Sequence, residues 1–201
     1  MASPVGMKSG ASFAVQLGRA PLADRKDDLY ETPIEAVRAL MAHEPLHGKL
    51  WEPACGRGAI SRPLIDAGFD VVSTDLVARA YGQGGVDFLM EHNAPPGVEA
   101  IVTNPPFKLA DEFVRHGLRL VPKVVMLLRW AYAEGASRSD IIDNHLSHVW
   151  LGKERLPFMH RDGYEGPKNS NSGAPFAWFV FTQQTCVENC GFVVRRISWR
   201  G

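Results

Sequence analysis

The fold is decided by the stretch Glu52-Pro53-Ala54-Cys55-Gly56-Arg57-Gly58. It follows a short apolar run at residues 49–51, which is typical of a buried strand, and precedes a helical pattern over residues 59–67. A glycine turn between a strand and a helix lets a ligand approach the backbone, because glycine tolerates positive φ and has no Cβ. The first N–H groups of the helix have no partner within the helix and can face that ligand. The stretch therefore predicts a strand–turn–helix unit with a binding site at its turn.

Strand and helix patterns alternate outward from this turn. Apolar runs typical of strands occupy residues 69–73, 86–89, 98–103, 123–128 and 148–151. Helical patterns occupy residues 34–41, 109–120 and 137–145. The alternation predicts an α/β fold with a mostly parallel central sheet of about seven strands and helices on both faces.

Two further local signals concern the ends of the pattern. Thr32-Pro33-Ile34-Glu35 is typical of a helix start, with Thr32 as the capping residue and Pro33 at the first helical position. The last two strand patterns, residues 176–182 and 192–199, have no helical pattern between them. We expect them to pair as an antiparallel hairpin at one edge of the sheet.

The composition is that of a soluble globular domain. The chain has 201 residues, 45% of them hydrophobic and 22% charged, which suffices for one sizeable core. Residues 1–28 are expected to form a flexible N-terminal arm. Three cysteines, no secretory apolar segment and no membrane-spanning apolar run favour a cytoplasmic protein. The formal net charge is zero, so the overall basic excess of a dedicated nucleic-acid binder is missing.

Two acids narrow the class of ligand. Asp75 follows the strand after the glycine turn, and an acid about 20 residues beyond such a turn binds ribose hydroxyls in dinucleotide-binding folds. The turn lacks the third glycine of that pattern, however, and Glu52 would repel a diphosphate. An acid at this place suits a cationic ligand such as S-adenosylmethionine, which has an amino group and a sulfonium and no phosphate. The alternative interpretation is a glycine turn without a ligand.

With these residues the chain resembles the class I S-adenosylmethionine-dependent methyltransferases, which have a Rossmann-like fold. Residues 52–58 look like their first motif. The resemblance implies that Asp75 binds the ribose and that Asp87-Phe88 holds the adenine of the cofactor; an ordinary surface carboxylate is the alternative for Asp87. Residues 30–33 resemble the segment that touches the methionine part. The cofactor-binding residues implied in this way are Tyr30, Thr32, Pro33, Glu52, Pro53, Ala54, Gly56, Gly58, Asp75, Leu76, Asp87, Phe88 and Asn104.

The tetrapeptide Asn104-Pro105-Pro106-Phe107 follows the apolar run 98–103, so it should lie at the carboxyl end of a strand, where open α/β sheets bind ligands. Two prolines stiffen this turn. The Asn104 side-chain oxygen and the Pro105 carbonyl would accept hydrogen bonds from an exocyclic amine, and Phe107 would stack on a base. The amine would then attack the sulfonium methyl in line, a reaction that depends mainly on positioning and requires no metal. The alternative is a proline-stiffened turn with a buried Phe107.

The same tetrapeptide resembles the catalytic motif of amino-group DNA methyltransferases, particularly the adenine N6 type, and this resemblance spans about residues 30–181. It implies that Asn104, Pro105, Pro106 and Phe107 are catalytic. Protein glutamine methyltransferases carry a similar tetrapeptide that usually ends in Tyr, so Phe107 favours a base. The expected function is methyl transfer to adenine N6 in DNA. Methylation of an RNA adenine or a protein glutamine, and a non-catalytic cofactor-binding subunit, remain the alternatives.

Recognition of the acceptor is the less determined part. A duplex adenine must be flipped out before its amine can be reached. Residues 29–201 are expected to form a single methyltransferase domain without a separate target-recognition domain, which implies low or short sequence specificity. A homodimer or a partner subunit is an alternative source of recognition. Trp130 is either a stacking platform for a nucleotide or a half-buried core residue. The expected substrate-binding residues are Phe107, Lys108, Trp130, Arg155, Arg161 and Lys168.

Overall fold

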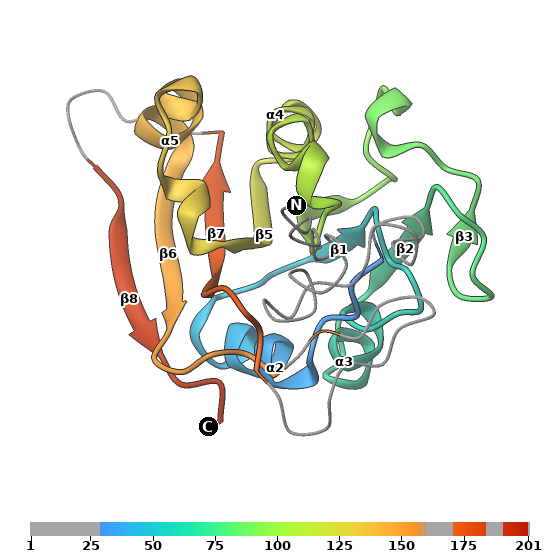
Figure 1. Cartoon of the computed structure of the whole chain (residues 1–201). Coiled ribbons are helices and arrows are strands. Elements are labelled where there is room, and N and C mark those ends of the chain that lie inside the picture. The colour runs from blue at the N-terminus through green and yellow to red at the C-terminus, as the bar shows by residue number, and fades with distance from the viewer. Residues whose placement is uncertain (1–28, 158, 160–170, 184–190, 201) are drawn as a thin grey trace, which may run out of the picture.

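The computed structural model describes residues 29–157, 159, 171–183 and 191–200 (Figure 1). The predicted arm, residues 1–28, lies outside them. Eight strands form one sheet in the order β3-β2-β1-β4-β5-β7-β6-β8. The strands are β1 (Lys49–Glu52), β2 (Val71–Asp75), β3 (Gln83–Gly84), β4 (Val98–Thr103), β5 (Lys123–Arg129), β6 (Leu146–Gly152), β7 (Phe176–Thr182) and β8 (Val193–Ile197). The α-helices are α2 (Ile34–His43), α3 (Ser61–Asp66), α4 (Ala110–Leu120) and α5 (Ser139–His145).

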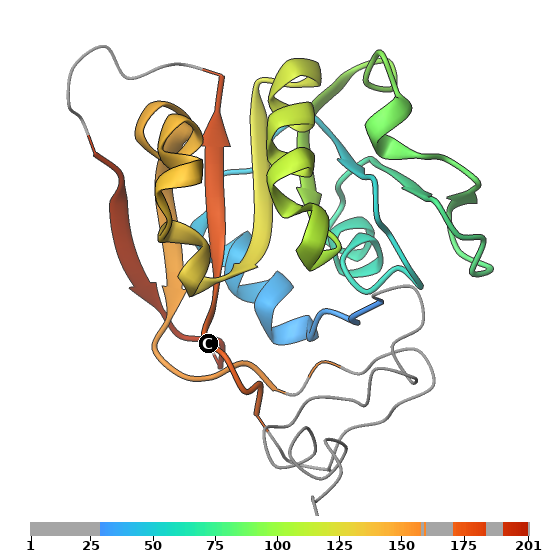
Figure 2. The same ribbon diagram turned by 45° about the horizontal axis from the view of Figure 1, so that its top comes forward.

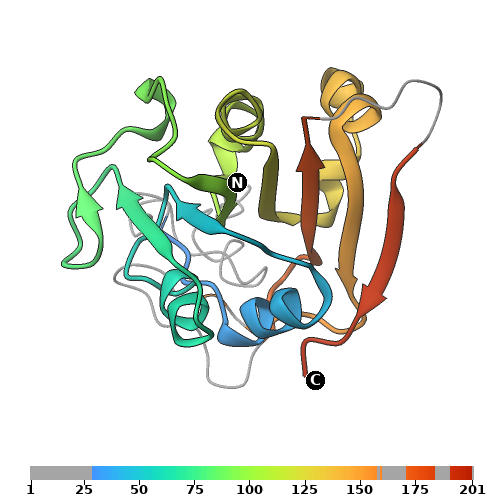
Figure 3. The same ribbon diagram turned by 180° about the vertical axis from the view of Figure 1, so that it is seen from behind.

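The sheet is mostly parallel, which confirms the predicted fold class. β1, β2, β3, β4 and β5 are parallel neighbours, and β7 runs antiparallel to both β5 and β6. The predicted pairing of the last two strands is wrong: β8 pairs in parallel with β6 and forms the outer edge. The reason is that β7 has β5 on one side and β6 on the other, so both of its hydrogen-bonding edges are occupied. Figure 3, a view from behind, shows β3 and β8 as the two outermost strands.

Helices cover the two faces of the sheet separately (Figures 1 and 2). Helices α2 and α3 bury their apolar residues on one face, where Leu40 and Leu64 pack in the same cluster as Trp178. Helices α4 and α5 lie over the other face, where Phe113 packs in the same cluster as Phe179. Every β7 residue from 176 to 181 is buried, because this strand lies between two others with a helical layer on each side.

Two local predictions near the site are wrong for identifiable reasons. Thr32 does not cap helix α2, whose N-cap is Pro33; the Thr32 hydroxyl accepts a hydrogen bond from Asn104 instead. Residues 86–89 are not a strand. Asp87 accepts a hydrogen bond from the Leu89 backbone N–H and caps a short 3₁₀ helix, η2 (Phe88–Met90), while the third strand of the chain is the two-residue β3.

A buried carboxylate, that of Glu44, connects helix α2 to strands β5 and β6 at the end of the sheet away from the glycine turn. Glu44 follows helix α2, and its side chain is fully buried. It accepts hydrogen bonds from Lys123 Nζ at 2.9 Å, His148 Nε2 at 2.6 Å and Trp150 Nε1 at 2.8 Å. Lys123 begins β5 and His148 lies near the start of β6, so the contacts fix α2 against the edge opposite the glycine turn. Within the described part of the chain, no helix is long and apolar enough to cross a membrane.

Candidate active site

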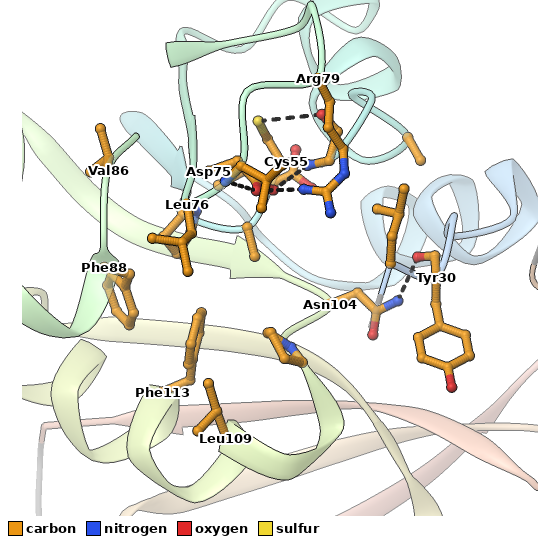
Figure 4. Close-up of a pocket in the computed structure, with 18 of the residues that line it drawn as sticks. Tyr30, Cys55, Asp75, Leu76, Arg79, Val86, Phe88, Asn104, Leu109 and Phe113 are labelled. Carbon is orange, nitrogen blue, oxygen red and sulfur yellow. Dashed lines mark hydrogen bonds and ion pairs between the residues drawn. The ribbon is translucent and has the colours of Figure 1, made fainter. Parts of the chain in front are cut away.

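A cavity of about 420 Å³ opens at the carboxyl ends of β1, β2 and β4 (Figure 4). This volume falls in the range of small-molecule and cofactor sites. All residues that line it lie between Leu29 and Phe113. The sequence-predicted residues among them are Tyr30, Thr32, Glu52, Pro53, Ala54, Gly56, Asp75, Leu76, Asp87, Phe88, Asn104, Pro106 and Lys108. Pro33, Gly58, Pro105 and Phe107 do not line this cavity.

The glycine turn needs its glycines. Gly56 has φ +53° and Gly58 has φ +85°, a region in which residues with a Cβ are strained. A Cβ on Gly58 would also lie 2.6 Å from the ring of Tyr81, which packs against this backbone. Gly56 donates its N–H to Asp75 Oδ2 at 2.8 Å. This bond joins the turn after β1 to the end of β2 and holds both at one rim of the cavity.

Asp75 has a partner that sequence reasoning missed. Its Oδ1 accepts from the Val77 N–H and from Arg79 Nη1, both at 2.8 Å, and both side chains of the Arg79–Asp75 pair are about nine-tenths buried. A ribose hydroxyl that binds Asp75 must therefore share this carboxylate with Arg79. The only sequence signal for the pair is the four-residue spacing between an acid and an arginine.

Glu52 lines the cavity, and its buried carboxyl has a raised pKa. Burial raises the pKa of Glu52 to about 8, against the lowering effect of hydrogen bonds from Ser61. Ser61 donates its backbone N–H to Glu52 Oε2 at 2.8 Å, and its hydroxyl makes a very short contact with the same oxygen. Cys55, the free cysteine among the described residues, is buried beside it, and burial raises its pKa to about 12. The Cys55 thiol therefore stays protonated near neutral pH.

The opposite part of the cavity is apolar. Leu76 is 63% exposed although it lines the cavity, and Leu109 is 39% exposed. Figure 4 shows Leu76 on the rim next to Phe88, facing Leu109 and Phe113 from the segment that leads into α4 and from α4 itself. Exposed leucines that face each other across a cavity form a slot that suits a flat apolar ring system. The Asp87 carboxylate borders this slot, although one of its oxygens already accepts from the Leu89 N–H.

The catalytic-loop candidate presents one unsatisfied acceptor. Asn104 Nδ2 donates to the Tyr30 carbonyl and to Thr32 Oγ1, both at 3.2 Å. Because the Tyr30 carbonyl can only accept, the amide nitrogen is fixed on its side and Oδ1 points the other way (Figure 4). Asn104 Oδ1 is buried and has no hydrogen-bond partner among the described residues. Such an atom normally has a partner, so its position at the cavity marks a place where a donor belongs.

Phe107 is surrounded by aromatic and cationic groups. Its ring centroid lies 4.6 Å from that of Tyr30 and 5.8 Å from that of Phe176, which begins β7 beside the end of β5. The Arg129 guanidinium lies 4.6 Å from the Phe107 centroid. Sequence reasoning missed Phe176 and Arg129, because neither belongs to a local motif and only the pairing of β5 with β7 brings them to Phe107.

The remaining predicted substrate-binding residues are not gathered at one place. Trp130 is half-buried, packs against Phe179 at 6.3 Å between ring centroids, and donates its backbone N–H to Pro175. Lys108 is exposed and borders the cavity. Arg155 is exposed and does not line the cavity. Arg161 and Lys168 lie outside the described residues.

Comparisons with known proteins place the fold. No family model matches the sequence, and no curated protein sequence is detectably similar to it. Solved structures share its architecture at low identity. A modification subunit assigned to a type I restriction enzyme from Vibrio vulnificus has a TM-score of 0.55 and 13% identity, covering 84% of this chain. This chain spans only 47% of that subunit.

Two further solved structures have a similar fold. A protein assigned as an RNA methyltransferase from Pyrococcus horikoshii has a TM-score of 0.56 and 14% identity, covering 85% of this chain and 96% of its own. TehB from Haemophilus influenzae has a TM-score of 0.51 and 14% identity, covering 75% of this chain and 62% of its own. The chain therefore has the Rossmann-like fold of class I S-adenosylmethionine-dependent methyltransferases.

Proposed function

We propose that this protein transfers a methyl group from S-adenosylmethionine to the exocyclic N6 amine of adenine in DNA. The observation that carries the proposal is Asn104 Oδ1, a buried acceptor without a partner among the described residues, held at the cavity by Tyr30 and Thr32. The fold and the cavity support a cofactor of this class, because the acid Glu52, the ribose-compatible Asp75 and the apolar slot at Leu76 surround one space.

The chain's own residues would bind and orient both reactants. S-adenosylmethionine, when bound, supplies an activated methyl group on a sulfonium. A cationic cofactor beside Glu52 would favour the ionised form of this carboxyl, which would then face the positive charge. The slot between Leu76 and Leu109 would hold the adenine of the cofactor. Asn104 Oδ1 and the Pro105 carbonyl would accept hydrogen bonds from the two N–H groups of the acceptor amine, which would localise the lone pair of its nitrogen. The amine proton would leave to water, so the protein contributes position and charge placement.

A DNA base is favoured as acceptor by the tetrapeptide and by one structural neighbour. Phe107 ends the tetrapeptide where protein glutamine methyltransferases usually have Tyr. The Vibrio vulnificus neighbour is assigned to a restriction enzyme, whereas the Pyrococcus horikoshii neighbour is assigned to RNA. RNA adenine is therefore the second candidate acceptor.

Transfer of a tritiated methyl group from labelled cofactor tests the acceptor. Purified protein is offered DNA, RNA and denatured protein in parallel, and the labelled nucleosides are identified by mass spectrometry. The proposal expects N6-methyladenine in DNA. Label only in RNA, or only in protein, would overturn the DNA acceptor while keeping the reaction.

Variants of Asn104 test the reaction itself. Asn104→Ala should retain cofactor binding by calorimetry and lose transfer by at least about a hundredfold, as removal of one positioned polar group does in other enzymes. Thr32→Val keeps the Asn104 amide but removes one of the two acceptors that orient it, so transfer should fall less. Unchanged transfer in Asn104→Ala would contradict the proposed role of this residue.

A further inference from the structure

A second pocket lies on the other side of the Asn104–Phe107 loop. Its volume is about 310 Å³, and its walls come from the start of α4 and from the segment after β5. Lys108 lines both this pocket and the cofactor cavity. Asn104 and Pro106 of this loop line the cofactor cavity, whereas Phe107 lines the second pocket, so the loop lies between the two spaces. The cofactor would occupy the first. We call the second the Arg129 pocket; its main polar residues are Lys108, Asp111, Arg129, Tyr132 and Arg138.

One cation of the Arg129 pocket is held rigidly and neutralises the one carboxylate. Arg138 donates Nε to the Tyr132 carbonyl at 3.1 Å and Nη2 to the Glu134 carbonyl at 2.7 Å. Its Nη1 lies 3.8 Å from Asp111 Oδ2, and its guanidinium lies over the Tyr132 ring at 4.8 Å. Arg138 and Asp111 therefore form a fixed pair whose charges largely cancel.

The other two cations are exposed, and no described carboxylate forms an ion pair with them. Lys108 and Arg129 lie on the side of the pocket next to the catalytic loop. The contact of the Arg129 guanidinium is the ring of Phe107, at 4.6 Å. The pocket therefore has an excess of positive charge next to the loop. Arginine on an aromatic face is a weak contact at an exposed site, so Arg129 can leave it at small cost.

A buried donor adds to this picture. Tyr132 lines the pocket and is only 8% exposed. Its hydroxyl makes no hydrogen bond of normal geometry with a described residue, although the Asp111 carboxylate lies next to it. Burial, and then the neighbouring Asp111 carboxylate, raise the pKa of Tyr132 well above its usual range, so the hydroxyl stays protonated and can donate. An anion in the Arg129 pocket would offer this hydroxyl an acceptor besides Asp111.

We propose that the Arg129 pocket is a phosphate subsite, in which Arg129 binds a backbone phosphate adjacent to the nucleotide that is methylated. The inference rests on the proposed function, because a nucleic-acid acceptor carries one phosphate on each side of the target base. A base that stacks on the part of the Phe107 ring covered by Arg129 would take the place of the guanidinium. Arg129 is exposed and pairs with no described carboxylate, so its guanidinium can move off this ring.

Entry of the base and binding of the phosphate are thus coupled. In the free protein Arg129 covers the ring that the base requires. When the base takes that position, the guanidinium turns into the pocket, where a phosphodiester offers the bidentate acceptor that arginine prefers. A free base, which has no phosphate, displaces Arg129 without this compensation. The arrangement therefore favours a nucleotide within a strand over an isolated base.

The test uses a short single-stranded oligodeoxynucleotide with one adenine, in which each phosphodiester is replaced singly by a neutral methylphosphonate. With the wild type, replacement beside the adenine should weaken binding about tenfold, and replacement at distant positions should not. Arg129→Ala should weaken binding to the unmodified strand by a similar factor and should no longer distinguish the modified strands. The logarithmic salt dependence of its affinity should fall by about 0.7, the value for one phosphate contact on a single strand.

Controls separate this inference from the proposed function. Arg38→Ala removes an exposed arginine of α2 that lines neither pocket, and it should match the wild type in every assay. Cofactor affinity should be unchanged in Arg129→Ala, because Arg129 does not line the cofactor cavity. If the wild type methylates the strand but Arg129→Ala retains the wild-type discrimination and salt dependence, the phosphate subsite is refuted and the proposed function stands. If the wild type methylates no nucleic acid, both are refuted.

Discussion

Ser61 directs both its backbone N–H and its hydroxyl to one carboxylate oxygen of Glu52, the backbone contact being 2.8 Å. The same hydroxyl lies 2.6 Å from that of Ser73 in β2. The first turn of helix α3 is thereby joined to the ends of β1 and β2. This small network supports the floor of the cofactor cavity, and its central carboxylate is buried with a raised pKa.

The raised pKa of Glu52 predicts a loss of stability with rising pH. The pKa is about 8 in the folded protein, against 4.5 for an unperturbed glutamate, so the folded protein holds a proton that the unfolded chain releases. The resulting loss of unfolding free energy is absent below pH 4.5, grows as pH rises from 4.5, and approaches its full size above about pH 8. Glu52→Gln should remove it, and at pH 9 this variant should exceed the wild type by on the order of a few kcal/mol. Thermal unfolding of the ligand-free protein across this pH range measures it; parallel curves would refute the shift.

The buried Glu44 network predicts the opposite dependence. Burial alone would raise the pKa of Glu44, but hydrogen bonds from His148, Lys123 and Trp150 outweigh it and lower the pKa to about 2. This carboxylate therefore stabilises the fold above the unperturbed pKa of 4.5, and the contribution is lost as pH falls from 4.5 toward 2. Glu44→Gln should cost roughly 3 kcal/mol at pH 7 and much less at pH 2, as judged by urea denaturation.

A surface ion pair provides the control for Glu44. Asp140 pairs with Arg115 at an exposed position. Asp140→Asn should change stability little at either pH, because solvent screens such pairs. Equal effects of Glu44→Gln and Asp140→Asn would show that the buried network contributes nothing beyond a surface contact.

The close packing of Tyr81 on the glycine turn predicts different stabilities for two glycine variants. Gly58→Ala should destabilise the protein by more than Gly68→Ala, although both residues have positive φ. A Cβ at Gly68 meets no atom within 4 Å, so this variant suffers backbone strain of about 1–2 kcal/mol only. A Cβ at Gly58 would additionally displace Tyr81, on which Arg62 stacks. Denaturant unfolding measures the difference, and equal losses would mean that the close approach of Tyr81 is unimportant.

Leu76 predicts an effect on cofactor binding without an effect on folding. Leu76→Ala should weaken S-adenosylmethionine binding by about tenfold, because roughly 1–2 kcal/mol of apolar contact is lost from the slot. Stability of the free protein should change little, since Leu76 is 63% exposed. Met90→Ala is the matched control: Met90 is 69% exposed and does not line the cavity. Titration calorimetry distinguishes them, and equal affinities for the two variants would argue against an adenine slot at Leu76.

Much of the fold follows from local sequence patterns. The bounds predicted for β4 and β7, residues 98–103 and 176–182, agree with the structure because each contains a continuous apolar run buried between neighbouring strands and helices. The pairing of β8 could not be predicted in this way. It depends on which strand edge is still free after β7 has inserted between β5 and β6, and this is a property of the whole sheet.

The residues of the first cavity are easier to predict from sequence than the surroundings of Phe107. Glu52, Asp75 and Asn104 end or follow strands directly, and parallel strands bring their carboxyl ends to one edge. Arg129 and Phe176 reach Phe107 only through the antiparallel pairing of β5 with β7. No local motif encodes such a contact. For the same reason, local sequence suggests a helix cap at residue 32, whereas its bond to the catalytic loop crosses a long stretch of chain.

The cofactor cavity takes every lining residue from the first part of the chain, between Leu29 and Phe113. The Arg129 pocket, by contrast, is completed by residues at the end of β5 and beyond it. The first cavity thus depends on one segment, whereas the Arg129 pocket needs residues from two segments. A change in the segment from β5 onward can therefore reshape the Arg129 pocket while every residue that lines the first cavity stays the same.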